Sequence, residues 1–252
     1  MFDLTGKVAL VTGGNGGLGL AFARGLVKQG ASVAIWGRNA EKNAAAVKEL
    51  RDMGANAAAF SCDVLSEENV AAAFAETLET FGKVDICMAN AGGGGFRGLS
   101  HQVGSKAWQD TIDLNVTSVT NTFAPVTEHL LARGEGGKLI VTSSAAALVG
   151  FANAAGYSTT KAAVVGLVKA LAVELGRANI QVNAILPGFV ETEMSLSTPQ
   201  AFQDAALRRS VLGRIGTFED MEGIAAFLAS NNSDYMTGQA LVIDGGHTIF
   251  PM

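Results

Sequence analysis

Two side chains at helical spacing could carry out acid–base chemistry in this 252-residue chain, Tyr157 and Lys161. Residues at i and i+4 lie on one face of a helix, with roughly 6 Å between their Cβ atoms. A free tyrosine has a pKa of about 10, and a nearby ammonium lowers it by favouring the tyrosinate. Such a pair could give a proton to a carbonyl oxygen that gains charge as hydride reaches its carbon, and Ser144, thirteen residues earlier, could hydrogen-bond the same oxygen. Taken alone, the pair also fits an ordinary exposed helix face.

The elements that would position this chemistry begin with a glycine-rich junction between a strand and a helix. Residues 8–11 form an apolar run typical of a strand buried on both faces, and five glycines follow within seven residues. From Leu18 onward, apolar residues recur at helical spacing. A pyrophosphate could lie against the free N–H groups of this helix N-terminus, where side chains would block its approach. A flexible glycine loop is the alternative interpretation.

Two patterns fit these glycines. G-x-G-x-x-G begins at Gly14 and is a weak signal by itself, whereas T-G-x-x-x-G-x-G begins at Thr12 and is the pattern of the short-chain dehydrogenase/reductase family. Further motifs resemble that family and follow in its order: Asn90-Ala91-Gly92, Ser144, Tyr157-x-x-x-Lys161 and Pro187-Gly188-x-x-x-Thr192. The resemblance runs from Leu4 to about Gly246, nearly the whole chain.

This resemblance implies one α/β domain over residues 1–252, a Rossmann-type doubly wound fold with a seven-stranded parallel sheet flanked by helices. Alternating strand and helix patterns continue without a linker, and one long helix is expected over about residues 105–132. The glycine-rich run 93–104 is expected to be a substrate-side loop, with an ordinary surface loop as the alternative. About residues 189–215 are expected to form a mobile substrate lid, with a plain connecting segment as the alternative.

The resemblance also implies roles for four polar side chains. Tyr157 would donate the proton in reduction and accept it in oxidation, while Lys161 would tune Tyr157 and hold the nicotinamide ribose. Ser144 would hydrogen-bond the substrate oxygen; Ser143 is its competitor, and only the interval to Tyr157 ranks the two. Asn115 stands among apolar neighbours, and a buried amide needs partners. It is either a satisfied structural amide or, as the resemblance implies, the anchor of a water between Lys161 and solvent.

The turn after the second expected strand bears on the choice of dinucleotide. An NAD site commonly has an acidic residue there for the ribose 2′-OH, whereas an NADP site needs an Arg for the 2′-phosphate. Gly37 ends this strand and Arg38 follows, so NADP(H) is favoured and NAD(H) stays open. Asp63 matches the family position beside the adenine, although it could merely cap its turn. The expected cofactor contacts are Gly13, Asn15, Gly17, Leu18, Gly19, Arg38, Asp63, Val64, Asn90, Ala91, Gly92, Tyr157, Lys161, Pro187, Gly188, Val190 and Thr192.

Composition and charge narrow the partners. The net charge of −5 and the scattered basic residues argue against a nucleic-acid surface. No apolar run reaches transmembrane length and the N-terminus lacks a secretory pattern, so a cytoplasmic location without membrane insertion is expected. The three histidines are far apart and predict no metal site, and the expected strand order keeps Cys62 and Cys87 too far apart for a disulfide. The resemblance and the apolar tail 248–252 imply a homotetramer or homodimer.

These observations predict an oxidoreductase that transfers a hydride between NADP(H) and a ketone or secondary alcohol, thus a carbonyl reductase or alcohol dehydrogenase. A fairly hydrophobic small-molecule substrate is indicated by Phe96, Leu148, Val149, Phe151 and Phe189. The second enzyme hypothesis is a 3-oxoacyl-carrier-protein reductase, for which Arg133 and Arg177 are candidate contacts to an acidic carrier. The non-enzyme hypothesis is a dinucleotide-binding redox sensor, which would be expected to lack one of the serine, tyrosine and lysine that are all present.

Overall fold

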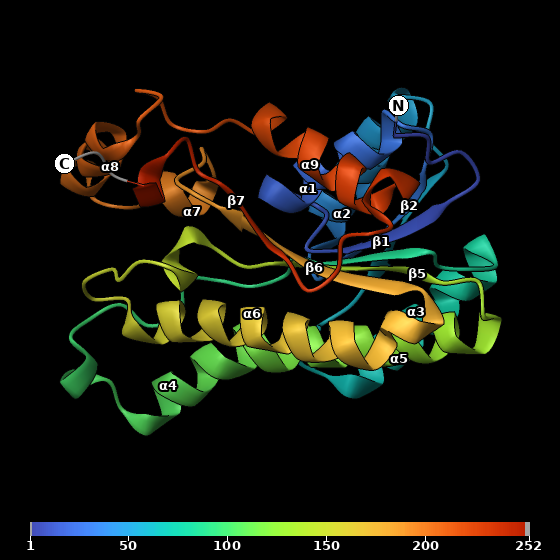
Figure 1. Cartoon of the computed structure of the whole chain (residues 1–252), viewed down its shortest axis with the longest axis horizontal. Helices are drawn as coiled ribbons and strands as arrows, with labels where there is room; N and C mark the ends of the chain where they lie inside the picture. Colours follow the sequence, from blue (N-terminus) through green and yellow to red (C-terminus); the bar gives the residue numbers. More distant parts are fainter. Residues whose placement is uncertain (1, 250–252) are drawn as a thin grey trace.

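The computed structural model describes residues 2–249 and shows a central sheet between two layers of helices (Figure 1). The strands are β1 (Val8–Thr12), β2 (Ser32–Gly37), β3 (Ala57–Ser61), β4 (Ile86–Ala89), β5 (Gly137–Thr142), β6 (Ile180–Pro187) and β7 (Ala240–Ile243). All are parallel, in the order β3-β2-β1-β4-β5-β6-β7. The doubly wound, seven-stranded sheet expected from the sequence is confirmed. The apolar tail from Phe250 onward lies outside the described residues.

Nine α-helices and six shorter helical turns connect the strands within residues 2–249. The α-helices are α1 (Gly17–Val27), α2 (Ala40–Asp52), α3 (Glu67–Phe81), α4 (Ser105–Ile112), α5 (Ser118–Arg133), α6 (Ala155–Leu175), α7 (Glu193–Leu196), α8 (Gln200–Arg209) and α9 (Glu219–Ala229). The shorter turns are η1 (Ser100–Gln102), the π-helix η2 (Asp113–Thr117), η3 (Ala145–Ala147), η4 (Gly176–Ala178), η5 (Asn231–Ser233) and η6 (His247–Ile249). None of the helices in this part of the chain has the length and apolar character needed to cross a membrane.

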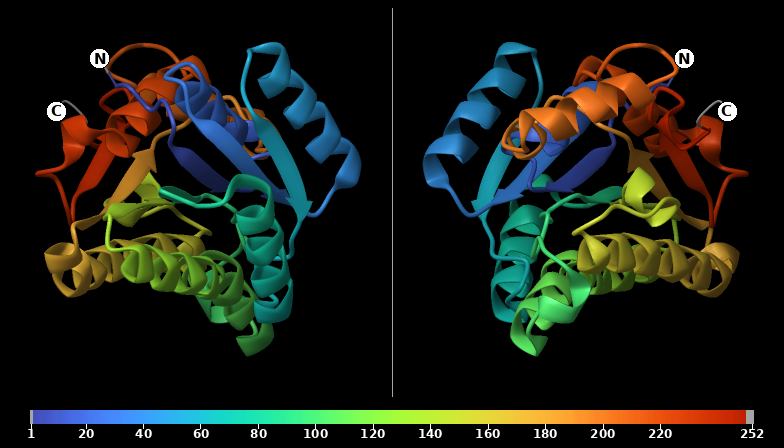
Figure 2. Two further views of the ribbon diagram at one scale, coloured as in Figure 1. Left: turned by 90° about the vertical axis from the view of Figure 1, so that its right-hand side faces the viewer. Right: turned by 90° about the vertical axis from the view of Figure 1, so that its left-hand side faces the viewer.

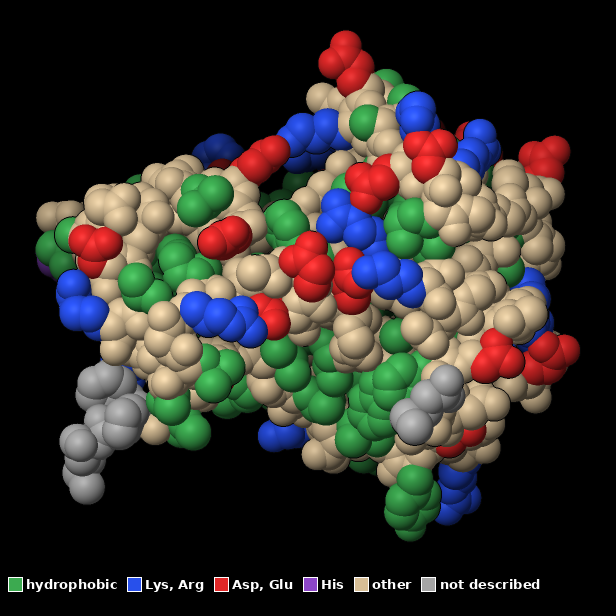
Figure 3. Space-filling model, turned by 90° about the horizontal axis from the view of Figure 1, so that it is seen from above, with side chains coloured by type: hydrophobic (Ala, Val, Ile, Leu, Met, Phe, Trp, Pro, Cys, Tyr) green, Lys and Arg blue, Asp and Glu red, His purple; other side chains and the backbone are tan. Residues whose placement is uncertain are grey.

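Strand residues alternate between two cores, because successive side chains point to opposite faces of a sheet. Leu10 belongs to the core that α3, α5 and α6 cover, whereas its neighbours Ala9 and Val11 belong to the core beneath α1, α2 and α9. Figure 2 shows these two helical layers from both sides of the molecule. On the outer face above α1, α2 and α9, acidic and basic side chains are interspersed instead of gathered by sign (Figure 3).

The long helix expected over about residues 105–132 runs without interruption through residues 105–133 and contains one π turn. The π-helix η2 joins α4 to α5, and the N–H of Ser118 bonds to the carbonyl of Asp113, five residues back. The helix expected over about residues 105–132 is therefore confirmed, and the π turn within it is a feature that an apolar pattern spread over several turns does not register. Single π turns within α-helices are frequent at functional sites, and this one contains Asn115.

Parallel strands bring their carboxyl ends to one edge of the sheet, and the loops that follow them meet there. The segments after β1, β4, β5 and β6 place Gly13, Asn90, Ser144 and Gly188 along this edge. Cys62 follows β3 and Cys87 lies in β4, and both are buried free thiols, as the strand order predicts. The residues with candidate chemistry therefore converge, whereas the cysteines do not.

Candidate active site

A cavity of about 460 Å³ opens at the carboxyl edge of the sheet and extends from the glycine turn after β1 to α6 and α8. The expected site residues that line it are Gly13, Asn15, Gly17, Leu18, Asn90, Ala91, Gly92, Ser144, Tyr157, Lys161, Pro187, Gly188, Val190 and Thr192. Those that do not are Gly19, Arg38, Asp63, Val64 and Asn115. Most of the expected cofactor contacts and three of the four expected catalytic side chains therefore share one space.

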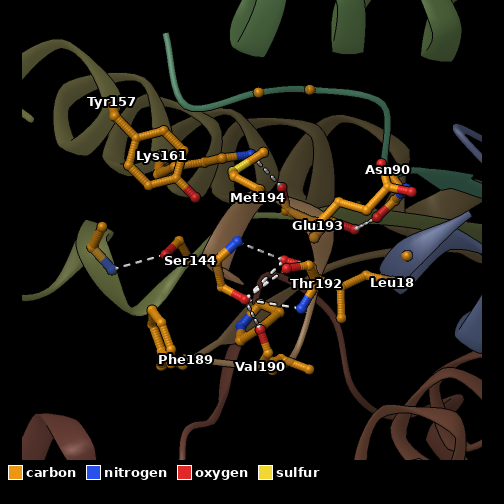
Figure 4. Close-up of a pocket in the computed structure, with 18 of the residues that line it drawn as sticks. Leu18, Asn90, Ser144, Tyr157, Lys161, Phe189, Val190, Thr192, Glu193 and Met194 are labelled. Carbon is orange, nitrogen blue, oxygen red and sulfur yellow. Dashed lines mark hydrogen bonds between the residues drawn. The ribbon is translucent and has the colours of Figure 1, made fainter. Parts of the chain in front are cut away.

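Tyr157 and Ser144 approach each other at the wall of this cavity (Figure 4). The Ser144 hydroxyl lies close enough to the phenol to oppose part of the effect of burial on the pKa of Tyr157. The Ser144 hydroxyl also accepts a bond of 3.1 Å from the N–H of Ala146, which fixes it at the start of η3. The Ser143 hydroxyl instead donates to the carbonyl of Lys161 at 2.7 Å, inside the fold. Of the two serines between which the sequence left a choice, Ser144 is the one beside the phenol.

Lys161 lies one helical turn beyond Tyr157 and is buried at the floor of the cavity. Its Nζ donates to the carbonyl of Thr142 at 2.9 Å and lies 5.8 Å from the centroid of the Tyr157 ring. Burial lowers the pKa of Lys161 to about 8, since the ammonium has lost most of its contact with water. This lysine is therefore poised to exchange a proton close to neutral pH.

The phenol of Tyr157 responds in the direction opposite to the one expected from the sequence. Burial raises its pKa, and the nearby Ser144 hydroxyl and the charge of Arg97 offset only part of that effect. The expected lowering by Lys161 was wrong for this geometry, because the ammonium is itself destabilised by burial and points to Thr142.

Asn115 supports the loop that borders the cavity from the π-helix η2. Its Oδ1 accepts a bond of 3.0 Å from the N–H of Gly93, and its Nδ2 donates to the carbonyl of Thr111 at 3.1 Å. A Cβ built on Gly92 would lie 2.8 Å from that Oδ1 and 3.6 Å from Nζ of Lys161, so both side chains approach Gly92. The side-chain amide is thus a satisfied structural group, and the water-anchoring role stays a prediction.

The glycine turn after β1 leaves open space beside the N-terminus of α1. Gly17 has a φ of 51°, and a Cβ there would meet nothing within 4 Å, although the residue lines the cavity. A side chain would therefore fill the space beside the N-terminus of α1, where an anion binds. At Gly19 a Cβ would lie 2.2 Å from the carbonyl oxygen of Gly13, so only glycine allows α1 to pack on the turn.

A network of amides surrounds the end of β2, where the dinucleotide choice was expected. Asn15 Nδ2 donates to Oδ1 of Asn43 at 2.7 Å, and Asn43 Nδ2 donates to the carbonyl of Gly37 at 2.9 Å. A Cβ on Gly37 would lie 2.3 Å from Asn15 Nδ2 and 2.6 Å from Asn43 Oδ1. A side chain at position 37 would therefore require both amides to move. Arg38 is exposed beside this network, and Asp63 caps its own turn by accepting from the N–H of Leu65 at 3.1 Å.

Several residues that line the cavity were not named individually from the sequence. Arg97 lies in the expected substrate-side loop, Met194, Phe202 and Ala206 lie in the expected lid, and Lys42 and His247 lie outside both segments. Lys42 extends from α2 to both carboxylate oxygens of Glu193 at the start of α7, each at 3.1 Å. The one available sequence signal was the four-residue spacing of Arg38 and Lys42, while the others lie in segments without a regular pattern. Over residues 2–249, no group of three or more His, Cys, Asp and Glu side chains is placed to hold a metal ion.

The fold and this cavity define a class of protein, a Rossmann-type oxidoreductase with a serine, a tyrosine and a lysine at the edge of a parallel sheet. A sequence model of the family described as enoyl-(acyl carrier protein) reductase matches residues 13–248. A 3-oxoacyl-[acyl-carrier-protein] reductase of Chlamydia pneumoniae is 36% identical over 245 residues, which cover 97% of this chain and 98% of that protein.

Solved structures agree with this assignment. A short-chain type dehydrogenase/reductase from Mycobacterium marinum superposes with a TM-score of 0.94 at 34% identity, over 98% of this chain and 97% of the other. A gluconate 5-dehydrogenase from Burkholderia cenocepacia, solved in complex with NADP and tartrate, gives a TM-score of 0.93 at 36% identity, over 99% and 98% of the chains. The chain belongs to the short-chain dehydrogenase/reductase family, whose members are oxidoreductases acting on alcohol and carbonyl groups.

Proposed function

We propose that this oxidoreductase transfers a hydride between NADP(H) and a ketone or secondary alcohol, as a carbonyl reductase or alcohol dehydrogenase of a fairly hydrophobic small molecule. The observation that carries the proposal is the convergence of Ser144, Tyr157 and Lys161 in the cavity that the glycine turn also lines. The two neighbouring hydroxyl groups can meet one carbonyl oxygen, and a dinucleotide in the same cavity would bring its nicotinamide to the carbonyl carbon.

In the proposed reaction, Ser144 and Tyr157 bind the carbonyl oxygen of the substrate. Tyr157 gives its proton to this oxygen as negative charge develops, and the Ser144 hydroxyl stabilises that charge by a hydrogen bond. The reduced nicotinamide supplies the hydride when it is bound. Lys161 restores the proton of Tyr157, which its lowered pKa of about 8 favours near neutral pH, and holds the ribose hydroxyls. Asn115 anchors the water through which Lys161 exchanges protons with solvent.

The dinucleotide would lie along the edge of the sheet. Its pyrophosphate would meet the N–H groups of Gly13 to Gly19, and its adenosine would lie between Arg38 and the segment Asp63-Val64. Asn90 to Gly92 and Pro187 to Thr192 would hold the nicotinamide half. Arg38 offers a planar cation for a 2′-phosphate, which supports NADP(H), and the Burkholderia relative was solved with NADP. NAD(H) is the alternative.

The same proposal extends to the surroundings of the site. The segment of about residues 189–215, which contains α7 and α8, would act as the substrate lid of a single catalytic domain. A cytoplasmic location and a homotetramer or homodimer follow from the sequence pattern and the family. The partner would be a small molecule and not a nucleic acid or a membrane.

A 3-oxoacyl-carrier-protein reductase is the second candidate, favoured by the similarity to the Chlamydia pneumoniae enzyme. The basic residues first considered for an acidic carrier give it little support. Arg133 bonds to Asp85, Glu135 and the carbonyl of Val84. It ends α5 just before β5, and Arg177 stands just before β6, so both lie at the sheet edge opposite the cavity.

Oxidation of NADPH, and separately of NADH, in the presence of ketones and a 3-oxoacyl thioester tests the function. Tyr157→Phe should retain dinucleotide binding and lose turnover by about 10³-fold, because the proton donor is gone. The matched control is Tyr235→Phe, since this tyrosine is fully exposed and lies outside the cavity lining. Absence of turnover with either dinucleotide on every substrate would contradict the proposal, as would undiminished turnover by Tyr157→Phe.

A further inference from the structure

Arg97 is a cation in the active-site cavity that the proposed proton transfer does not use. Its side chain lines the cavity, and its guanidinium carbon lies 5.4 Å from the centroid of the Tyr157 ring. An arginine over an aromatic face is held there by the electrostatic attraction of the ring. One small substrate could therefore contact both the guanidinium and the phenol that binds its carbonyl oxygen.

The loop that carries Arg97 is fixed on both sides of this residue. The N–H of Phe96 bonds to the Thr111 hydroxyl in α4 at 3.3 Å, and the N–H of Gly98 bonds to the carbonyl of Asn153, just before α6, at 2.9 Å. Asn153 has a φ of 60°, a conformation that few residues other than glycine adopt. Such backbone persists when its surroundings hold it, so the placement of Arg97 is built into the site.

Arg97 lacks an anionic partner within the described part of the chain. No carboxylate of residues 2–249 lies within 4.0 Å of its guanidinium nitrogens, whereas Arg24 pairs with Glu49 and Arg133 with Asp85. The one acidic side chain that lines the cavity there, Glu193, is bound by Lys42. The substrate side of the cavity thus presents an uncompensated positive charge next to Tyr157.

We propose that Arg97 binds a carboxylate of the substrate, which makes the substrate a 2-oxo acid with an apolar side chain; this rests on the proposed carbonyl reduction. The planar guanidinium matches a carboxylate with two parallel hydrogen bonds. Its position against the Tyr157 ring places the acid group close to the carbonyl, as it is in a 2-oxo acid. The apolar remainder fits the aromatic wall, where Phe202 lies 6.3 Å from Phe151 and 5.9 Å from Phe189 between ring centroids.

The reaction balances as a two-electron reduction. The carbonyl carbon of the 2-oxo acid accepts hydride from the reduced dinucleotide, and its oxygen accepts the proton of Tyr157, which solvent replaces. The products are a 2-hydroxy acid and the oxidised dinucleotide. The carboxylate keeps its charge throughout, so the bond to Arg97 orients the substrate without taking part in the transfer.

Benzoylformate and its methyl ester test this assignment, because they share the reacting carbonyl and differ in charge. In Arg97→Met, the ratio of kcat/KM for the acid to that for the ester should fall at least about tenfold, the loss typical of a hydrogen-bonded charge pair. Arg177→Met, an exposed arginine at the opposite sheet edge, should keep the ratio of the unmodified enzyme. Arg97→Lys should recover part of the preference, since it restores the charge without the planar fork.

Direct binding gives a second readout. Calorimetry of the protein with its oxidised dinucleotide should show benzoate binding that Arg97→Met weakens at least about tenfold. Benzamide carries no charge and should bind the unmodified protein and Arg97→Met with the same affinity. An equal fall for acid and ester, or the same displacement of both pH profiles, would mean that Arg97 acts only through Tyr157, and would overturn the proposal. If the enzyme oxidises NADPH with none of the ketones, the acid or the ester, the proposed function fails. A benzoate affinity that is the same in Arg97→Met and in the unmodified protein overturns the carboxylate site independently of that result.

Discussion

The buried ammonium of Lys161 should be visible as a pH dependence of unfolding. Burial lowers its pKa from 10.5 to about 8, whereas the unfolded chain returns it to the ordinary value. Between these two pKa values the unfolded state binds more protons than the folded state, so the free energy of unfolding rises with pH. This contribution is fully present above the pKa of Lys161 in the unfolded chain. It is lost as the pH falls to the pKa of Lys161 in the folded protein. From about pH 7 to about pH 9.5, these two values give a gain of about 2 kcal/mol.

Urea unfolding of the unmodified protein and of Lys161→Met at these two pH values measures the effect. Methionine removes the titration and keeps an apolar chain of similar length, so the unmodified protein should gain about 2 kcal/mol relative to the variant as pH rises. The difference between the proteins cancels other titrating groups, including the Cys62 thiol, whose pKa burial raises to about 11. Lys169→Met, at an exposed position of α6, is the matched control. Equal gains in Lys161→Met and the unmodified protein would refute the reasoning.

Three further substitutions separate cofactor choice, packing and the sheet edge. Arg38→Ala should weaken NADPH binding at least about tenfold and NADH binding far less, as measured by fluorescence titration, because a bidentate charge pair is lost; equal losses would contradict the NADP(H) assignment. Gly19→Ala should weaken dinucleotide binding and lower the midpoint of urea unfolding, since its Cβ would lie 2.2 Å from a carbonyl oxygen, whereas Gly166→Ala, with open space in α6, should be neutral or stabilising by up to about 1 kcal/mol. Asp85→Asn should cost about 2 kcal/mol near neutral pH. Burial opposes the charge of Asp85, but the N–H of Val8 and two cations nevertheless lower its pKa; this stability is present above the unfolded value and is lost in acid, so the unmodified protein should lose more of it than the variant as urea-unfolding curves are taken to low pH.

Most of the fold was predictable because the periodicity of apolar residues indicates strands and helices, and the positions of glycines indicate the turns between them. The apolar run 8–11 lies in β1, the expected number of seven parallel strands is present, and the helix that opens at the glycine turn begins at Gly17. The π turn at Asn115 within the long helix could not be predicted in the same way. A π turn depends on how a helix packs against its neighbours, and the alternation of apolar and polar residues is too coarse to register one extra residue.

The site was predictable to the extent that motifs fix spacing along the chain. Spacing favoured Ser144 over Ser143, but only the structure shows the Ser143 hydroxyl bonded to the Lys161 carbonyl. The direction of the pKa shift of Tyr157 was not predictable, because it depends on how much water the folded chain leaves around the phenol. Arg97 belongs to an irregular loop, so its position over the ring follows from tertiary hydrogen bonds that the sequence does not display.

The amide network at the end of β2 constrains how this chain could evolve or be redesigned. Recognition of a ribose 2′-OH commonly uses an acidic residue near Gly37, yet any Cβ there would lie 2.3 Å from Asn15 and 2.6 Å from Asn43. A change at Gly37 alone would therefore first meet a steric barrier and only afterwards alter cofactor recognition. Residue 37 is therefore coupled to Asn15 and Asn43, and the effect of an acidic side chain at position 37 should depend on the residues present at positions 15 and 43.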